Sequence, residues 1–153
     1  MSLISLASFE SVWRGYEYYR DYHVIHAAQT EDDSFSGIVS GHGQSYQVYV
    51  NTAHPRKSHC NCPHAAGRRT ICKHMVALYF CVFPDEAENY YDQVIAAEEE
   101  AERLQEKTEK ALIRHVRSMT KPELEQALLQ LLLEGPEWQY DRFLRENVDE
   151  YLE

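Results

Sequence analysis

Apolar residues near the start of the chain recur every three to four positions. Phe9, Val12, Trp13, Tyr16 and Tyr19 follow this spacing, which predicts an amphipathic helix over about residues 8–21. The period then changes. Residues 23–30 are β-prone, residues 34–40 and 45–51 alternate between apolar and polar, and short polar turns separate the three runs. This pattern predicts a three-stranded antiparallel meander after the helix.

The second half of the chain is mostly helical in pattern. Residues 52–71 show no period and are predicted to be loop, and residues 72–83 form an apolar helix that Pro84 ends. A long polar helix is predicted over 89–119. Thr120 and Glu123 form a capping box that opens the next helix, and Gly135 ends it. A final helix runs from Trp138 to the last residues, and these two helices are expected to pair as an αα-hairpin.

The charge is unevenly divided along the 153 residues. Residues 1–84 carry seven Lys/Arg and six Asp/Glu, whereas residues 85–153 carry eight and nineteen, a net charge of −11. This shift indicates a boundary at Pro84–Asp85 between an N-terminal domain, 1–84, and an acidic helical region, 85–153. The predicted fold class is α+β: a helix, a small antiparallel sheet, a loop and an apolar helix, followed by an all-helical C-terminal region.

Composition excludes several classes of protein. No run approaches the 18 or so apolar residues that a membrane helix needs, and the first residues have neither a basic n-region nor a long apolar h-region. We therefore expect a cytoplasmic protein without a membrane partner. Four cysteines in that setting favour a metal site or free thiols over disulfides.

Three of the four cysteines form the most informative motif. Cys60 and Cys62 are followed, after nine residues, by Cys72 and His74, giving a C-x-C…C-x-H pattern. Zinc prefers four nitrogen or sulfur ligands in a tetrahedron, and these four side chains would close its coordination shell. We predict one structural Zn²⁺ on these four residues. The flanking histidines, His59 and His64, are expected at the surface.

The fourth cysteine, Cys81, is predicted to be a buried structural thiol. It lies two helical turns beyond His74, roughly 10 Å away at 1.5 Å per residue, which is too far to share the ion. No metalloprotease, nucleophile-elbow or phosphate-loop motif occurs in the chain. We therefore do not expect an enzyme.

The ligand segment resembles the SWIM zinc finger. The match is C60-N-C62-PHAAGRRTI-C72-K-H74, followed by the apolar helix M-V-A-L, and it extends upstream through RGYEYYRDYHV and the predicted strands. This resemblance implies a ββα finger around a structural zinc, without enzymatic activity of its own. Members occur in bacterial Swi/Snf-type ATPases and their neighbours, and their proposed roles are DNA binding or protein–protein contact.

The segment around the finger is basic and contains no acid from residue 51 to 84. Its cations could contact phosphates, although a solvated loop explains them equally well; they are Arg56, Lys57, Arg68, Arg69 and Lys73. The tyrosines of the first helix could stack on bases, but core and rim packing is the simpler interpretation; they are Tyr16, Tyr18, Tyr19 and Tyr22.

Two functions remain open from the sequence. The first is a zinc-stabilised module that binds nucleic acid, with DNA favoured by the local charge and the resemblance. The alternative is an adaptor, in which the zinc finger and the helices form a scaffold that docks on a protein partner such as a Swi/Snf-type ATPase. The acidic helices could contact a basic partner or shield the finger until one arrives. The adaptor predicts an apolar or charged patch on the helical half of the chain.

Overall fold

The computed structural model describes residues 2–148. It divides into two compact units, Met1–Ala96 and Ala97–Glu153, and each is described by itself. The division falls inside a single helix, twelve residues after the predicted boundary. Whether 1–84 and 85–153 act as separate functional domains stays a prediction.

The first unit begins with a short 3-10 turn, Ile4–Leu6, and the predicted amphipathic helix, α1, Phe9–Arg20. Ser8 caps α1, since its hydroxyl accepts a hydrogen bond from the Ser11 backbone N–H at 3.2 Å. Tyr16 packs in an aromatic cluster with Phe80, Tyr90 and Tyr91. The helical tyrosines are therefore core and rim residues, apart from Tyr22, which is exposed beyond the helix.

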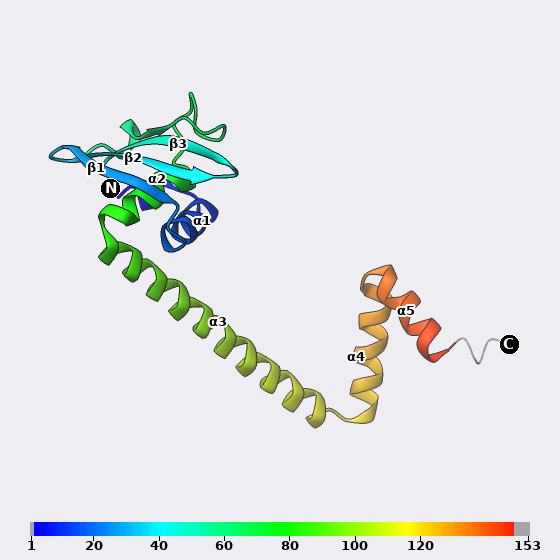
Figure 1. Ribbon diagram of the computed structural model, residues 1–153. Coiled ribbons are helices and arrows are strands. Elements are labelled where there is room, and N and C mark those ends of the chain that lie inside the picture. Colours follow the sequence, from blue (N-terminus) through cyan, green and yellow to red (C-terminus); the bar gives the residue numbers. More distant parts are fainter. Residues whose placement is uncertain (1, 149–153) are drawn as a thin grey trace. The chain divides into compact units, whose positions relative to one another are not determined.

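The predicted meander forms strands β1, Val24–Glu31, β2, Ser34–Gly41, and β3, Gln44–Asn51 (Figure 1). The β2–β3 turn is the two-residue loop His42–Gly43, with φ of 50° and 75°. Positive φ at both positions is the backbone of a type I′ turn, whose twist suits a tight hairpin. The three predicted strands are thus confirmed in place and order.

The region predicted to be loop contains two further elements. A 3-10 turn, η2, Pro55–Lys57, leads into strand β4, His59–Cys60, which completes an antiparallel sheet of order β1-β2-β3-β4. The sequence predicted three strands, and β4 is a fourth strand that it did not predict. A strand of two residues has no periodicity to detect, and β4 exists because Cys60 pairs with Val48 on β3.

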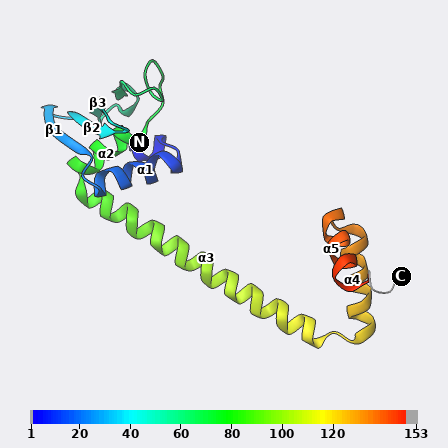
Figure 2. The same cartoon turned by 45° about the vertical axis from the view of Figure 1, so that its right-hand side comes forward.

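One face of the sheet is covered by helix α2, Lys73–Val82, on which α1 packs (Figures 1 and 2). Side chains 75–80 of α2 are all buried. The two helices meet at Gly15, where an added Cβ would lie 2.5 Å from the Val76 side chain. Helix α2 is therefore the apolar centre of the core, as its sequence predicted. Its first turn is held against α1 by the close contact at Gly15.

Pro84 ends α2 as predicted but also begins the next helix, α3, Pro84–Ser118. The predicted start at Asn89 was therefore five residues too late. Proline suits the first turn of a helix because its missing N–H has no intrahelical partner there, and Asp85 and Glu86 add favourable charge in that turn.

The second unit contains the rest of α3 and helices α4, Lys121–Glu134, and α5, Glu137–Asn147. The capping box is confirmed: the Glu123 carboxylate accepts hydrogen bonds from the Thr120 N–H and hydroxyl, each at 2.7 Å. Helices α4 and α5 contact each other, as the predicted hairpin requires. Tyr151 and Leu152, assigned to the last helix from the sequence, lie outside the described residues. No helix within 2–148 is long and apolar enough to cross a membrane.

Candidate metal centre

Two segments bring the four predicted ligands together. Cys60 ends β4 and Cys62 follows two residues later, while Cys72 occupies the N-cap position of α2 and His74 lies in its first turn. The extended conformation of Cys72, with φ of −98° and ψ of 165°, turns the chain from the loop into the helix. The β4 pairing and the buried helix therefore fix the two halves of the site independently.

The four side chains form a single buried cluster. Their candidate ligand atoms all lie within 4.8 Å of one another, and His74 Nδ1 lies 3.8 Å from Cys60 Sγ and 4.0 Å from Cys72 Sγ. A tetrahedral zinc with a bond of about 2.0 Å to nitrogen and about 2.3 Å to sulfur has nitrogen–sulfur edges of about 3.5 Å and sulfur–sulfur edges of about 3.8 Å. The donor set and its spacing thus fit one zinc ion, with Nδ1 as the histidine ligand.

Aromatic packing fixes the His74 ring. Tyr46 stacks on the ring with centroids 4.4 Å apart, and Tyr18 meets it edge-on at 5.5 Å. Nε2 of His74 is buried and has no hydrogen-bond partner among the described residues. Many metal-binding histidines are oriented by an acceptor on the second nitrogen, whereas here the two tyrosines take that role. Gly41 leaves the necessary space, since an added Cβ would lie 3.0 Å from the Tyr18 hydroxyl.

The cysteines differ in acidity. A hydrogen bond from the Cys60 thiol, and then one from His74, lowers the pKa of Cys72 to about 4 despite its burial. The same bond to Cys72, followed by burial, raises the pKa of Cys60, and burial raises that of Cys62. Cys72 is therefore the most acidic of the three thiols. Zinc, when bound by all three as thiolates, adds a rigid cross-link between the loop and α2.

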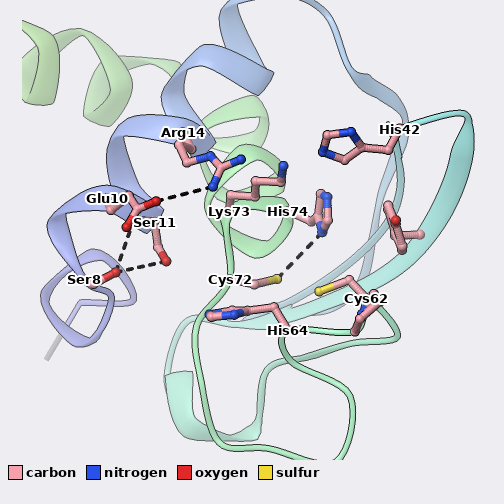
Figure 3. Close-up of a pocket in the computed structure, with 12 residues that line it drawn as sticks. Ser8, Glu10, Ser11, Arg14, His42, Cys62, His64, Cys72, Lys73 and His74 are labelled. Carbon is pink, nitrogen blue, oxygen red and sulfur yellow. Dashed lines mark hydrogen bonds and ion pairs between the residues drawn. The ribbon is translucent and has the colours of Figure 1, made fainter.

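A pocket lies beside the cluster, between the start of α1 and the finger loop (Figure 3). Arg14 and Lys73 line it together with His42 and His64. Arg14 pairs with Glu10 at 3.3 Å, and Lys73 Nζ donates to the Tyr18 hydroxyl at 2.7 Å. Lys73 is thus held partly buried against α1, unlike the other predicted contact residues.

The remaining predicted contact residues are exposed. Arg56 and Lys57 lie on η2, and Arg68 and Arg69 lie in the loop between the two ligand pairs. None of the four forms an ion pair with an acidic side chain within residues 2–148. Four cations are therefore free to meet an anionic partner.

Two further predictions about flanking residues have opposite outcomes. His59 and His64 are exposed, as expected. The prediction of a buried Cys81 was wrong: its thiol is exposed, because it lies in the last turn of α2, just beyond the buried run 74–80. The sequence did not predict that Tyr18 and Tyr46 would orient the His74 ring. Alternation in β3 identifies Tyr46 only as a core residue.

Comparison with curated proteins gave no match, and neither did comparison with solved structures. A comparison with protein-family models matched one segment of the chain, residues 46–83. The matched segment starts in β3, contains β4 and all four ligands, and ends just beyond α2, in the ββα order that the resemblance implied. Residues 46–83 of this chain match the family model of the SWIM zinc finger.

Proposed function

We propose that this zinc-binding module is a non-catalytic recognition domain that binds nucleic acid, with DNA as the preferred class. The observation that carries the proposal is a set of four exposed cations on segments next to the buried metal centre, none of which forms an ion pair within residues 2–148. The stretch 51–84 that contains them has no acidic residue. Fixed positive charge on a rigid support is what phosphate contacts need.

Fluorescence anisotropy with the zinc-loaded full chain tests this proposal. Labelled single- and double-stranded DNA are titrated at low and at physiological salt, with the variant Arg68→Ala/Arg69→Ala alongside. We expect binding that weakens with salt, and a salt slope about two units smaller in the variant, roughly one per lost phosphate contact. Arg114→Ala/Arg117→Ala is the matched control, because it removes the same charge from exposed positions on α3. Absence of binding at low salt would contradict the proposal.

A catalytic role is not part of this proposal. Catalytic zinc sites keep one coordination position for water or substrate, whereas four protein side chains converge here within 4.8 Å. This view would be contradicted if the protein turned over a substrate and lost that activity when one metal ligand was replaced, while the fold stayed intact.

A second function, a protein-interaction adaptor, is favoured by the helical unit. Leu132 is the only buried side chain within residues 97–148. Large apolar side chains on α4 and α5 are exposed: Leu129 by 58%, Leu133 by 71% and Trp138 by 64%. Leu129 and Leu133 are one turn apart on α4 and share a face, and exposed apolar surface spread over several side chains marks interaction sites. The adaptor hypothesis predicted such a patch on the helical half.

The charge of the helical region favours a basic partner. Residues 85–153 carry a net charge of −11, so a second copy would add repulsion to any apolar contact. A partner with an apolar stripe flanked by lysine or arginine would satisfy both features. A Swi/Snf-type ATPase is the candidate that the family resemblance suggests.

Sedimentation of the chain mixed with such an ATPase from the same organism tests the adaptor. In a Trp13→Phe background we expect co-sedimentation and a blue shift of Trp138 emission, both lost in Leu129→Ser/Leu133→Ser and kept in the control Gln126→Ser/Gln130→Ser, which changes exposed polar positions at the same spacing on α4. Free sedimentation of both proteins would contradict the adaptor for this partner.

A further inference from the structure

The face of the sheet opposite α2 has a regular pattern of outward side chains. Residues paired across the four strands form two rows: His26, Ile38, Gln47 and Asn61 in one row, and Ala28, Ser36, Tyr49 and His59 in the other. Neither α1 nor α2 covers this face, because both lie on the other side of the sheet. Ile38 and His59 are exposed.

Two rings on this face form a stacked pair. Tyr49 on β3 and His59 on β4 have centroids 4.8 Å apart and planes at 24°. The Tyr49 hydroxyl hydrogen-bonds with Ser34 Oγ at 2.9 Å, which fixes the ring. The next residues along the row, Ser36 and Ala28, are small, and a shallow groove runs past Ser36, Tyr49 and His59. The groove therefore offers flat aromatic surface with room beside it.

Positive charge borders the same pair. The His59 ring nitrogen Nδ1 lies 3.3 Å from the Lys57 carbonyl oxygen, so η2 adjoins the ring directly. Pro55 and Ser58 on either side of the two cations are buried, and Ser58 Oγ accepts a hydrogen bond from the Asn51 backbone N–H at 3.0 Å. Arg56 and Lys57 therefore project from a fixed support at the β4 edge. The acids Asp32 and Asp33 lie in the β1–β2 turn instead.

We infer that this open sheet face binds single-stranded nucleic acid, with a base stacked against the Tyr49–His59 pair and the backbone phosphates along Arg56 and Lys57. Aromatic surface supplies sequence-tolerant stacking, and neighbouring cations follow the backbone. Single-stranded bases suit this surface because they are free to turn their flat faces outward, whereas bases in a duplex are stacked on one another. The inference rests on the proposed nucleic-acid function and narrows it to one surface and one strand state.

The test uses the zinc-loaded full chain and two labelled probes, a single strand of about twelve thymidines and a duplex of the same length, which suit the usual site size. His59→Ala removes an exposed ring, and Tyr49→Leu removes its partner while keeping apolar bulk. We expect each variant to weaken single-strand binding about tenfold, the usual effect of one stacking ring, with an unchanged salt slope. Duplex binding should change less than about twofold, and His59→Phe should restore single-strand affinity.

The outcomes separate this inference from the function on which it rests. If wild type binds the single strand and neither ring variant weakens it, the stacking surface is refuted while the nucleic-acid function stands. Equal losses on both probes, or wild-type binding to duplex alone, also overturn the inference only. If wild type binds neither probe at low salt, the nucleic-acid function itself fails. Should Tyr49→Leu unfold, shown by circular dichroism, the exposed His59→Ala and His59→Phe variants still decide.

Discussion

Cys72 and His74 connect the metal to the core, because both belong to the first turn of the buried helix α2. Structural zinc contributes about 10–16 kcal/mol of binding free energy, comparable with or above the whole stability of a small domain. We therefore predict that Cys72→Ser or His74→Ala unfolds residues 52–83. Loss of helical circular dichroism and of bound zinc checks this. His74→Cys is the matched control, since a fourth thiolate is also a zinc ligand. A cooperative, stable fold in the Ser and Ala variants would contradict a structural role for the metal.

The acidity of the cysteines gives a pH dependence with a definite sign. The pKa values of Cys60 and Cys62 are raised by hydrogen bonding or burial, so both thiols keep their protons near neutral pH, while Cys72 with its pKa of about 4 is already ionised. Zinc must displace those two protons. We predict that zinc affinity, measured by competition with a chelating dye, rises at least about a hundredfold per pH unit around neutrality. A rise of tenfold or less would show that fewer thiols ligate the metal.

The packing of α1 on α2 reverses the usual effect of one substitution. Glycine inside a helix normally costs about 1 kcal/mol relative to alanine, so Gly15→Ala would stabilise an isolated α1. Here the new Cβ would lie 2.5 Å from Val76 and 2.9 Å from the Lys73 carbonyl oxygen. We predict a loss of about 1–3 kcal/mol, measured by denaturant unfolding followed through Trp13 in a Trp138→Phe background. Arg14→Ala, on the exposed side of α1, should change stability by less than about 0.5 kcal/mol. A stabilised Gly15→Ala variant would contradict the close contact.

Elements with strong periodicity could be predicted from the sequence, and those formed by tertiary context could not. The 3–4 spacing from Phe9 to Tyr19 predicted α1, and alternation predicted β2 and β3, because each buries one face. The ligand spacing predicted the cluster, since three thiolates and one imidazole suit a tetrahedral zinc ion; these ligands are Cys60, Cys62, Cys72 and His74. Strand β4 could not be predicted because two residues carry no period. The Tyr49–His59 pair could not be predicted either, since it depends on the register of β4 against β3.

At the scale of the whole molecule, the chain contains two units with different sources of stability. The first has a core of sheet, α1, α2 and the metal cluster, whereas the second has one buried side chain within its described residues. Each unit contains one tryptophan, Trp13 or Trp138. We predict that zinc chelation lowers the unfolding temperature reported by Trp13 in a Trp138→Phe variant and leaves the transition reported by Trp138 in a Trp13→Phe variant unchanged. An equal shift in both variants would show that the metal stabilises the two units jointly.

The predictions for the ligand variants, for the pH dependence of zinc affinity and for chelation all depend on a closed zinc centre with three sulfur ligands and one nitrogen ligand. X-ray absorption spectroscopy at the zinc edge, combined with metal analysis of the purified full chain, measures this directly. The predicted result is one zinc per chain, with three sulfur neighbours at about 2.3 Å and one nitrogen at about 2.0 Å. Fewer than three sulfurs, an oxygen ligand in the first shell, or a metal-free folded chain would contradict it.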